Sequence, residues 1–168
     1  ASEPGWIDVA GGKAPPIEAL KAIIRREVEK KKPGEWIMLW GYDQNKLAEK
    51  RHPTRWDFDE AAPNNPAFCT RACGHMSVGN TAAFAAAGLT DPSAFQPGEV
   101  VVDERGEMTG LVKEAANGAL GALAQYNDDD ILQGLKLAGE QLSSLGLTSV
   151  HDMGHNGAQF MRLMQKAA

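Results

Sequence analysis

Cysteine is scarce in this chain of 168 residues, which contains Cys69 and Cys73 and no others. Two cysteines cannot provide the several disulfides that hold small secreted domains together. If a strand that begins at Ala67 continues to Cys73, the two side chains share one face but lie too far apart to bridge easily. We therefore predict two small, buried hydrophobic residues in the reducing cytoplasm and no disulfide. A metal pair at this spacing is the alternative, although no further cysteine supports it.

Long hydrophobic runs are also lacking, and none approaches the roughly 20 residues that a membrane-spanning helix needs. The first residues, Ala1 to Pro4, have neither the basic nor the apolar region of a secretory signal. The net charge is −5, so the positive excess that favours nucleic acid or an anionic membrane is missing. We expect a cytoplasmic protein with no nucleic-acid or membrane partner, long enough for one domain with a real core.

The first third of the chain predicts a helix followed by a buried strand. Pro15 and Pro16 open the helix, and apolar residues then recur about every 3.6 positions from Ile17 to Val28. Residues 35–41 are aromatic and β-compatible, which indicates a buried strand. Asp43 is placed to cap a short helix directly after it.

The last third predicts a hairpin and three helices. Residues 99–103 and 108–112 flank a turn in which Gly106 tolerates positive φ. Apolar spacing and capping residues predict helices over 117–125, 128–145 and 158–166, with a buried strand over 147–152. We expect several short strands and about five helices in all, a mixed α/β fold.

The organising stretch of the chain runs from residue 53 to residue 89. A polar, turn-rich approach leads to a short apolar strand from Ala67, a tight Gly74-His75 step and a helix of small residues closed by Gly88. Polar side chains at such a turn can reach a ligand while the flanking elements hold the turn still. We therefore looked for functional side chains at this turn first.

His75 is the leading candidate for chemistry, because its ring can stand in a cleft beside Gly74. A neutral imidazole there could bond a substrate carbonyl or act as acid or base, although a structural histidine that bonds backbone fits equally well. Glu114 could line a barrel or serve as a first-turn helix acid. Asn80 could cap a helix or contact substrate.

His151 and Asp152 stand at the end of the predicted strand 147–152, which in an α/β barrel faces the active site. Asp152 could instead cap the next helix. His151 and His155 are four apart, but Gly154 argues against the helix that would make them a metal pair. Elsewhere we expect Arg55 and Asp57 to pair and pin a loop, and His52 to be an exposed loop residue.

The chain resembles the YtcJ-like branch of the metal-dependent amidohydrolase superfamily over most of its length. The matching segments are Trp36–Asp43, Pro53–Asp59 (PTRWDFD), Pro66–Phe68, Gly74-His75, Asn80–Ala83, Ala87–Leu89, Thr109–Ala115 and Gly146–Asp152. This resemblance implies a (β/α)8, or TIM, barrel hydrolase that acts on carbon–nitrogen bonds. It also implies a divalent metal, zinc in the first place, that activates water.

The family's first metal ligands come from a His-x-His pair, and this chain contains no His-x-His. We therefore predict an internal segment of a longer amidohydrolase, the parent protein. The fold class would be mixed α/β, part of a (β/α)8 barrel with its insertion between the first two barrel strands. The insertion would span about residues 1–145, and a barrel strand with its following helix about residues 146–168.

On this hypothesis the segment shapes a pocket for a small molecule with a non-peptide amide or cyclic amide. The predicted catalytic residues are His75, Asp152 and Glu114, and the predicted substrate contacts are His75, Asn80 and His151. No metal is expected on the segment itself, which by itself would be inactive. Exposed strand edges favour a homo-oligomer or packing against the rest of the parent.

Two other hypotheses stay open from the sequence. The chain could be a non-catalytic small-molecule-binding or interaction domain that uses the turn between Cys69 and His75. It could also be a hydrolase complete in itself, which requires His75, Glu114, His151 and Asp152 to converge in space.

Overall fold

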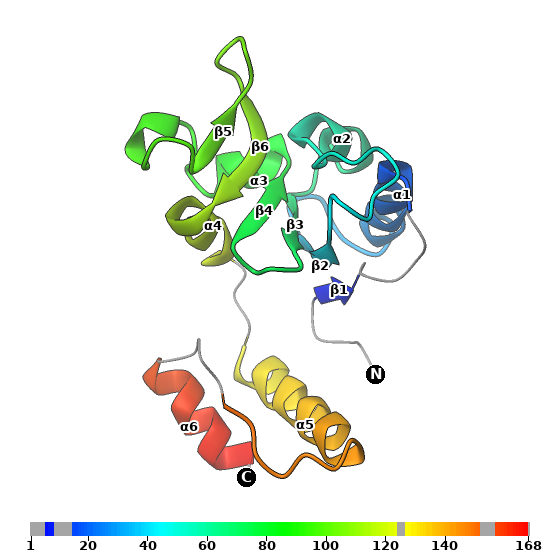
Figure 1. Ribbon diagram of the computed structural model, residues 1–168, viewed down its shortest axis with the longest axis vertical. Helices are drawn as coiled ribbons and strands as arrows, with labels where there is room; N and C mark the ends of the chain where they lie inside the picture. Colours follow the sequence, from blue (N-terminus) through cyan, green and yellow to red (C-terminus); the bar gives the residue numbers. More distant parts are fainter. Residues whose placement is uncertain (1–5, 9–14, 124–126, 152–156, 168) are drawn as a thin grey trace. The chain divides into compact units, whose positions relative to one another are not determined.

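The computed structural model describes residues 6–8, 15–123, 127–151 and 157–167. These residues fall into two compact units, one from Trp6 to Ala124 and one that holds residues 125–168 (Figure 1). The compact units of this chain divide at residues 124–125. The boundary predicted near residue 145 is a different one, because it separates the insertion from the barrel strand in the proposed parent protein. No helix among the described residues is long and apolar enough to cross a membrane.

The first unit is built on one mixed sheet, in which the described residues form six strands in the order β1-β2-β3-β4-β6-β5. The strands β1 (Trp6–Asp8), β2 (Ile37–Tyr42) and β3 (Ala67–Arg71) run parallel. The strands β4 (Met76–Gly79), β6 (Met108–Lys113) and β5 (Val100–Val102) continue the sheet with antiparallel pairings. This sheet confirms the predicted mixed α/β class.

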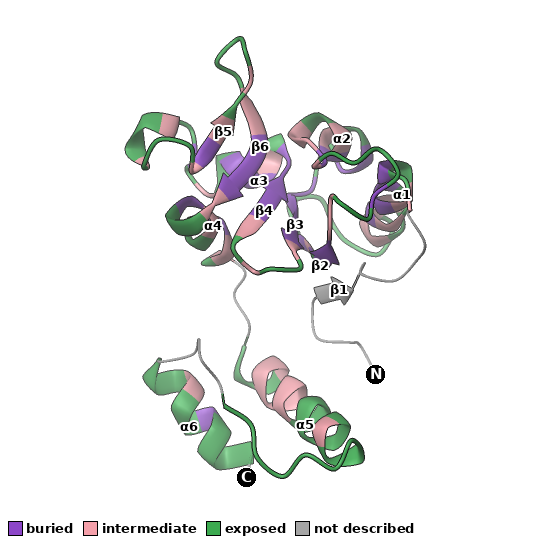
Figure 2. Ribbon diagram, in the orientation of Figure 1, coloured by how far each residue is buried: buried purple, intermediate pink, exposed green. Residues whose placement is uncertain are grey.

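Helices cover both faces of the sheet (Figures 1 and 2). On one face α1 (Ile17–Val28) and α2 (Arg55–Ala61) bury apolar residues against Leu39, Cys69 and Val78. On the other face α3 (Thr81–Ala86) and α4 (Glu114–Gly121) pack on Phe68 and Val112. Cys69 and Phe68 are neighbours in β3 and enter different cores because side chains alternate along a strand.

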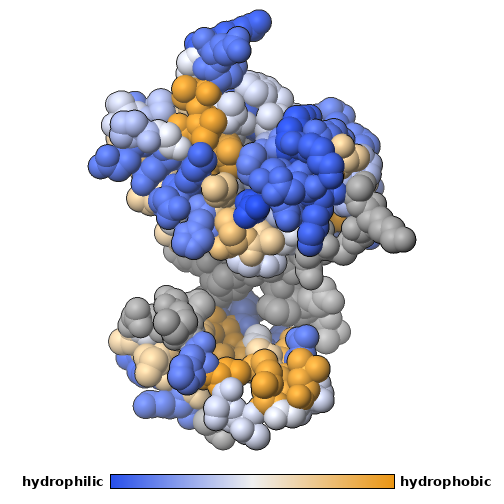
Figure 3. Space-filling view, in the orientation of Figure 1, coloured by the Kyte–Doolittle hydropathy of each residue, from blue (hydrophilic) through white to orange (hydrophobic). Residues whose placement is uncertain are grey.

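The second unit is a pair of helices, α5 (Asp128–Ser144) and α6 (Ala158–Ala167), that contact each other. Asn127 caps α5, because its side chain accepts a hydrogen bond from the backbone of Asp130. Figure 3 shows hydrophobic surface over this unit. Its large exposed apolar side chains are Leu137, Leu145, Leu147, Val150, Met161 and Met164.

Several predicted elements are confirmed. α1 begins after Pro15-Pro16, and β2 occupies most of the predicted strand 35–41. The hairpin of β5 and β6 forms, with Gly106 at φ 79° in its turn. α5 and α6 lie where apolar spacing places them, and the predicted helix 117–125 begins earlier, at Glu114.

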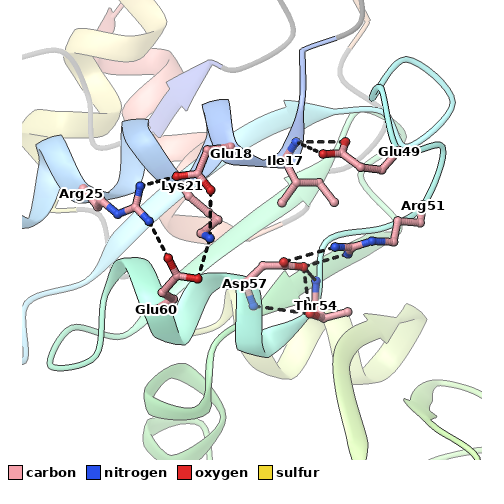
Figure 4. Close-up of polar contacts among 9 residues, drawn as sticks. All are labelled: Ile17, Glu18, Lys21, Arg25, Glu49, Arg51, Thr54, Asp57 and Glu60. Atoms are coloured by element: carbon pink, nitrogen blue, oxygen red, sulfur yellow. Dashed lines mark hydrogen bonds and ion pairs between the residues drawn. The ribbon is translucent and has the colours of Figure 1, made fainter.

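The approach at residues 53–66, predicted as a loop, contains α2 (Figure 4). A capping box begins this helix: Thr54 Oγ1 accepts from the backbone of Asp57, and Asp57 Oδ2 accepts from the backbone of Thr54 at 2.8 Å. The predicted Arg55–Asp57 pair is wrong, because Asp57 bonds Arg51 at 2.8 Å. Arg55 instead meets Glu107, at 3.5 Å.

Charged side chains join α2 to α1 beside this capping box (Figure 4). Lys21, whose side chain is only 10% exposed, lies 2.9 Å from Glu18 and 2.7 Å from Glu60. Arg25 pairs with the same two carboxylates. Because both glutamates are well exposed, each pair contributes modestly, but the shared contacts fix how the two helices meet.

The helix predicted directly after Gly74-His75 is wrong in its first part, which is the strand β4. Met76 to Gly79 pair with β3 and β6, and α3 begins only at Thr81. The small residues Ser77 and Gly79 have little preference for a helix. Hydrogen bonding to strands on both sides therefore decides the conformation of β4. The stretch is therefore strand, turn, strand and helix.

Two further predicted elements differ from the structure. Asp43 accepts from the backbone of Asn45 in a turn, and no short helix follows it. Residues 147–151, the described part of the predicted strand 147–152, are not a strand, and Leu147 and Val150 are 49% and 57% exposed. A strand needs a neighbour for its backbone groups, and among the described residues none pairs with this segment.

His52 is a half-buried partner of Tyr42 rather than an exposed loop residue. The Tyr42 hydroxyl lies 2.9 Å from His52 Nδ1. Burial raises the pKa of Tyr42, so the hydroxyl keeps its proton and shares one hydrogen bond with the His52 ring nitrogen. Burial first, and then the nearby cations Arg71 and Lys113, lower the pKa of His52 below its usual 6.5.

The lowered pKa of His52 predicts a loss of stability in acid. The unfolded chain protonates His52 more readily than the folded chain does, because the folded pKa is lower. The contribution of His52 to the free energy of unfolding is therefore fully present above pH 6.5. It is lost as pH falls from 6.5 through the folded pKa. Urea unfolding of the wild type and His52→Gln between pH 7.5 and 5 should show a gap in free energy of unfolding that narrows as pH falls. A constant gap would contradict the assignment.

Gly110 of β6 lies very close to neighbouring backbone. A Cβ there would lie 2.7 Å from Arg55 Cβ, Arg55 N and Gly79 O, and the residue has φ 96°. We expect Gly110→Ala to lower the free energy of unfolding by about 2 kcal/mol or more, from strain and overpacking. The matched control is Gly118→Ala in α4, where the added methyl meets open space; equal losses in thermal unfolding would refute the prediction.

Candidate functional site

The turn between β3 and β4 presents the candidate site. β3 ends at Arg71 and β4 begins at Met76, so Cys73, Gly74 and His75 lie on the connection. Gly74 adopts φ 79°, a conformation that suits glycine, and so allows the tight reversal. Both Cys73 and His75 are exposed there.

The structure brings together His75 and Glu114, which are 39 residues apart in sequence. His75 Nδ1 lies 3.3 Å from Glu114 Oε2, and the two side chains are 68% and 61% exposed. The Glu114 backbone N–H also donates to His75 O at 3.0 Å. Two of the three predicted catalytic residues are therefore in contact with each other at an exposed position.

The register of the sheet explains this meeting. Ser77 of β4 pairs with Val112 of β6. Because side chains alternate along a strand, His75, two residues before Ser77, continues the face of Ser77. The hydrogen bond from the Glu114 N–H to His75 O, directly after the last residue of β6, brings Glu114 beside it. That face is the one which α3 and α4 cover, so the pair lies where the first turn of α4 meets the sheet.

The backbone at Glu114 is strained. Its φ is 45°, in the left-handed region that a residue with a side chain rarely adopts. Such outliers persist where the surroundings enforce them, and they cluster at functional sites. Here Asn117, one turn along α4, donates from Nδ2 to Gly74 O at 2.9 Å, so α4 holds both Gly74 and His75.

Sequence reasoning missed Asn117, although its position three residues after Glu114 places both on one side of a helix. The hydrogen bond from Asn117 to Gly74 could not be predicted from the sequence, because it depends on how α4 packs against the β3–β4 turn. Together the contacts can orient an imidazole and move a proton at its free nitrogen, which is the chemistry of a histidine–carboxylate pair.

Cys73 contradicts the prediction that both cysteines are buried, because it is exposed on the turn while Cys69 is buried in the first core. Desolvation raises the pKa of the Cys73 thiol, but the Arg71 guanidinium and the His75 backbone N–H outweigh it and lower the pKa. Burial raises the pKa of Cys69, which is an inert core residue. Neither cysteine is in a disulfide.

Asn80, a predicted substrate contact, is fully buried and used by the fold. Its Oδ1 accepts from the backbone of Ala67 at 3.0 Å and of Ala83 at 2.8 Å. Its Nδ2 donates to the carbonyls of Ala62 and Asn65, both at 2.9 Å. These bonds use both donors and both acceptor positions, so no group of the amide is left for a ligand.

His151 is an exposed residue of the second unit, after α5. Asp152 and His155 lie outside the described residues. Of the four side chains that the hypothesis of a hydrolase complete in itself requires, the structure shows His75 and Glu114 in contact.

The described residues do not make a complete metal site by themselves. Within the part of the chain that the structure describes, no group of three or more His, Cys, Asp or Glu side chains could hold a metal ion. A catalytic zinc takes three protein ligands, and the His75–Glu114 pair offers two.

The buried amide of Asn80 gives a stability prediction. Asn80→Ala would leave two buried N–H groups and two carbonyls without partners, so we expect a loss of about 3 kcal/mol in free energy of unfolding. Asn64→Ala, at an exposed position nearby, should change it by less than about 0.5 kcal/mol. Equal urea midpoints for the two variants would mean that the amide does not hold the strand and helix together.

Comparisons with known proteins give the wider context of this site. The model of the amidohydrolase family matches residues 3–168. The chain is 29% identical over 161 residues to an N-substituted formamide deformylase of Arthrobacter pascens, and 30% identical over 155 residues to the putative amidohydrolase YtcJ of Bacillus subtilis. These alignments cover 90% and 89% of this chain but 29% of each relative, so the chain spans less than a third of their length.

Solved structures give the same picture. Two uncharacterized metal-dependent hydrolases, from Pyrococcus horikoshii and Pyrococcus furiosus, superpose with TM-scores of 0.61 and 0.59 at 27% identity. The alignments cover 96% of this chain and 30% and 31% of those proteins. With a family match that extends from residue 3 to residue 168, this chain belongs to the amidohydrolase family.

Proposed function

We propose that this chain is part of a longer metal-dependent hydrolase that cleaves a carbon–nitrogen bond in a small cytoplasmic substrate. The observation that carries the proposal is the His75–Glu114 contact of 3.3 Å on a chain of this family. Support for the bond type comes from the deformylase of Arthrobacter pascens, which acts on N-substituted formamides. Support for the metal comes from the titles of the two Pyrococcus hydrolases.

The proposed parent is a (β/α)8 barrel in which this chain supplies the insertion after the first barrel strand. Its divalent metal, zinc in our proposal, would be held by side chains outside the described residues and would supply an activated water. The sheet unit would form one wall of the pocket. The exposed apolar side chains of α5 and α6 would pack against the rest of the parent or a second copy.

Within this pocket the roles of the pair follow from its geometry. Glu114 contacts His75 Nδ1, which leaves the other ring nitrogen of this exposed side chain for a ligand. That nitrogen could donate to the carbonyl oxygen of a bound amide, or pass a proton to the leaving nitrogen. Glu114 would fix the tautomer of the imidazole and remain a positioning residue, as carboxylates that bond a catalytic histidine do.

The experiment uses the full natural chain that contains this sequence, with N-substituted formamides as substrates. We expect His75→Gln to lower kcat/KM about 100-fold or more, the usual contribution of a general acid or base. Glu114→Gln should lower it less, about 10-fold, because the imidazole loses its orientation but keeps its place. Release of the amine measures the rate.

Glu104→Gln, at the exposed tip of the β5–β6 hairpin, is the control and should keep wild-type activity. Metal content is measured for every variant and should not change, which separates a pocket role from a loss of metal. Full activity in His75→Gln would refute the assigned role. Ligand binding without any hydrolysis would instead favour the non-catalytic small-molecule-binding domain.

A further inference from the structure

Trp40 of β2 lies on the same face of the sheet as the His75–Glu114 pair. Trp40 pairs in register with Thr70 of β3, and Thr70 pairs with Ser77 of β4. Residues paired in register point to the same face, and His75 continues the face of Ser77. The hydrogen bond of 2.8 Å between Thr70 and Ser77 agrees with this, since it joins their side chains on that face.

The indole ring also reaches the turn that carries His75. A Cβ built on Gly74 would lie 3.5 Å from Cη2 of Trp40, which is an ordinary contact distance. Gly74 directly precedes His75, and Asn117 holds its carbonyl. Trp40 is 39% exposed, so the residue is partly open to solvent near this turn.

We propose that Trp40 is a specificity-determining residue of this site, an aromatic wall that favours amides with a flat aromatic group on their nitrogen. This inference rests on the proposed function and adds the class of substrate. Ligand sites combine a few polar groups with apolar and aromatic walls, and Trp40 is the large apolar side chain next to the pair. Flat rings stack on an indole better than puckered rings of the same size, because the faces meet over more atoms.

Trp56 provides a matched comparison within the same chain. It is 43% exposed, similar to Trp40, and the Arg55 guanidinium lies 5.0 Å from its ring centroid. It belongs to α2, which packs through Phe58 on the opposite face of the sheet. Trp56→Ala therefore controls for the general effect of removing a partly exposed indole, and Trp40→Ala adds the effect of removing the one near His75.

The test compares formanilide with N-cyclohexylformamide, two formamides with six-carbon rings that differ in flatness. In the full natural chain, the ratio of kcat/KM for formanilide to that for N-cyclohexylformamide should fall about 2- to 12-fold in Trp40→Ala. Trp40→Phe keeps a flat ring and should keep most of the preference. Trp56→Ala should leave the ratio unchanged.

An unchanged ratio in Trp40→Ala, with both substrates cleaved, overturns the role of Trp40 and leaves the proposed function intact. If the wild type cleaves neither formamide, the proposed function is wrong, and calorimetric titration with formanilide then decides on Trp40 alone. Weaker binding in Trp40→Ala than in Trp56→Ala supports the aromatic wall. Equal binding in the two variants, or no binding to the wild type, overturns it.

Discussion

The pairing of β4 with strands on both sides is the constraint on which the rest of the sheet unit depends. β4 joins the parallel strands β1 to β3 to the antiparallel hairpin of β5 and β6. Its pairing with β3 reverses the chain at Gly74, and its pairing with β6 carries Glu114 to His75. The core and the candidate site are therefore consequences of one register, and a slip by one residue would disperse both.

Local patterns were sufficient for much of the fold. Apolar spacing located α1, α5 and α6, and Gly106 marked the β5–β6 turn, because each signal lies within a few residues. β4 was missed because four residues with two small side chains carry little local preference, and its partners come from elsewhere in the chain. The sequence analysis did not predict α2, although Thr54 and Asp57 have the spacing of a capping box, which indicates the start of a helix.

The candidate site was predictable one residue at a time, but not as a unit. His75 and Glu114 were each recognised from their flanking residues and from the resemblance to the family, and their contact follows only from the strand register. The prediction that Asn80 contacts substrate is wrong, because backbone groups around its amide take up the side chain's hydrogen bonds. Asn117 and Trp40 had no signal in the sequence that points to the turn.

The left-handed backbone of Glu114 carries an evolutionary consequence. Glycine would adopt that conformation without strain, so replacement by glycine is the change that a selection for thermal robustness alone would favour. Such a selection would also delete the carboxylate beside His75. The backbone strain at Glu114 and the carboxylate that it places beside His75 are therefore removed together by a change to glycine.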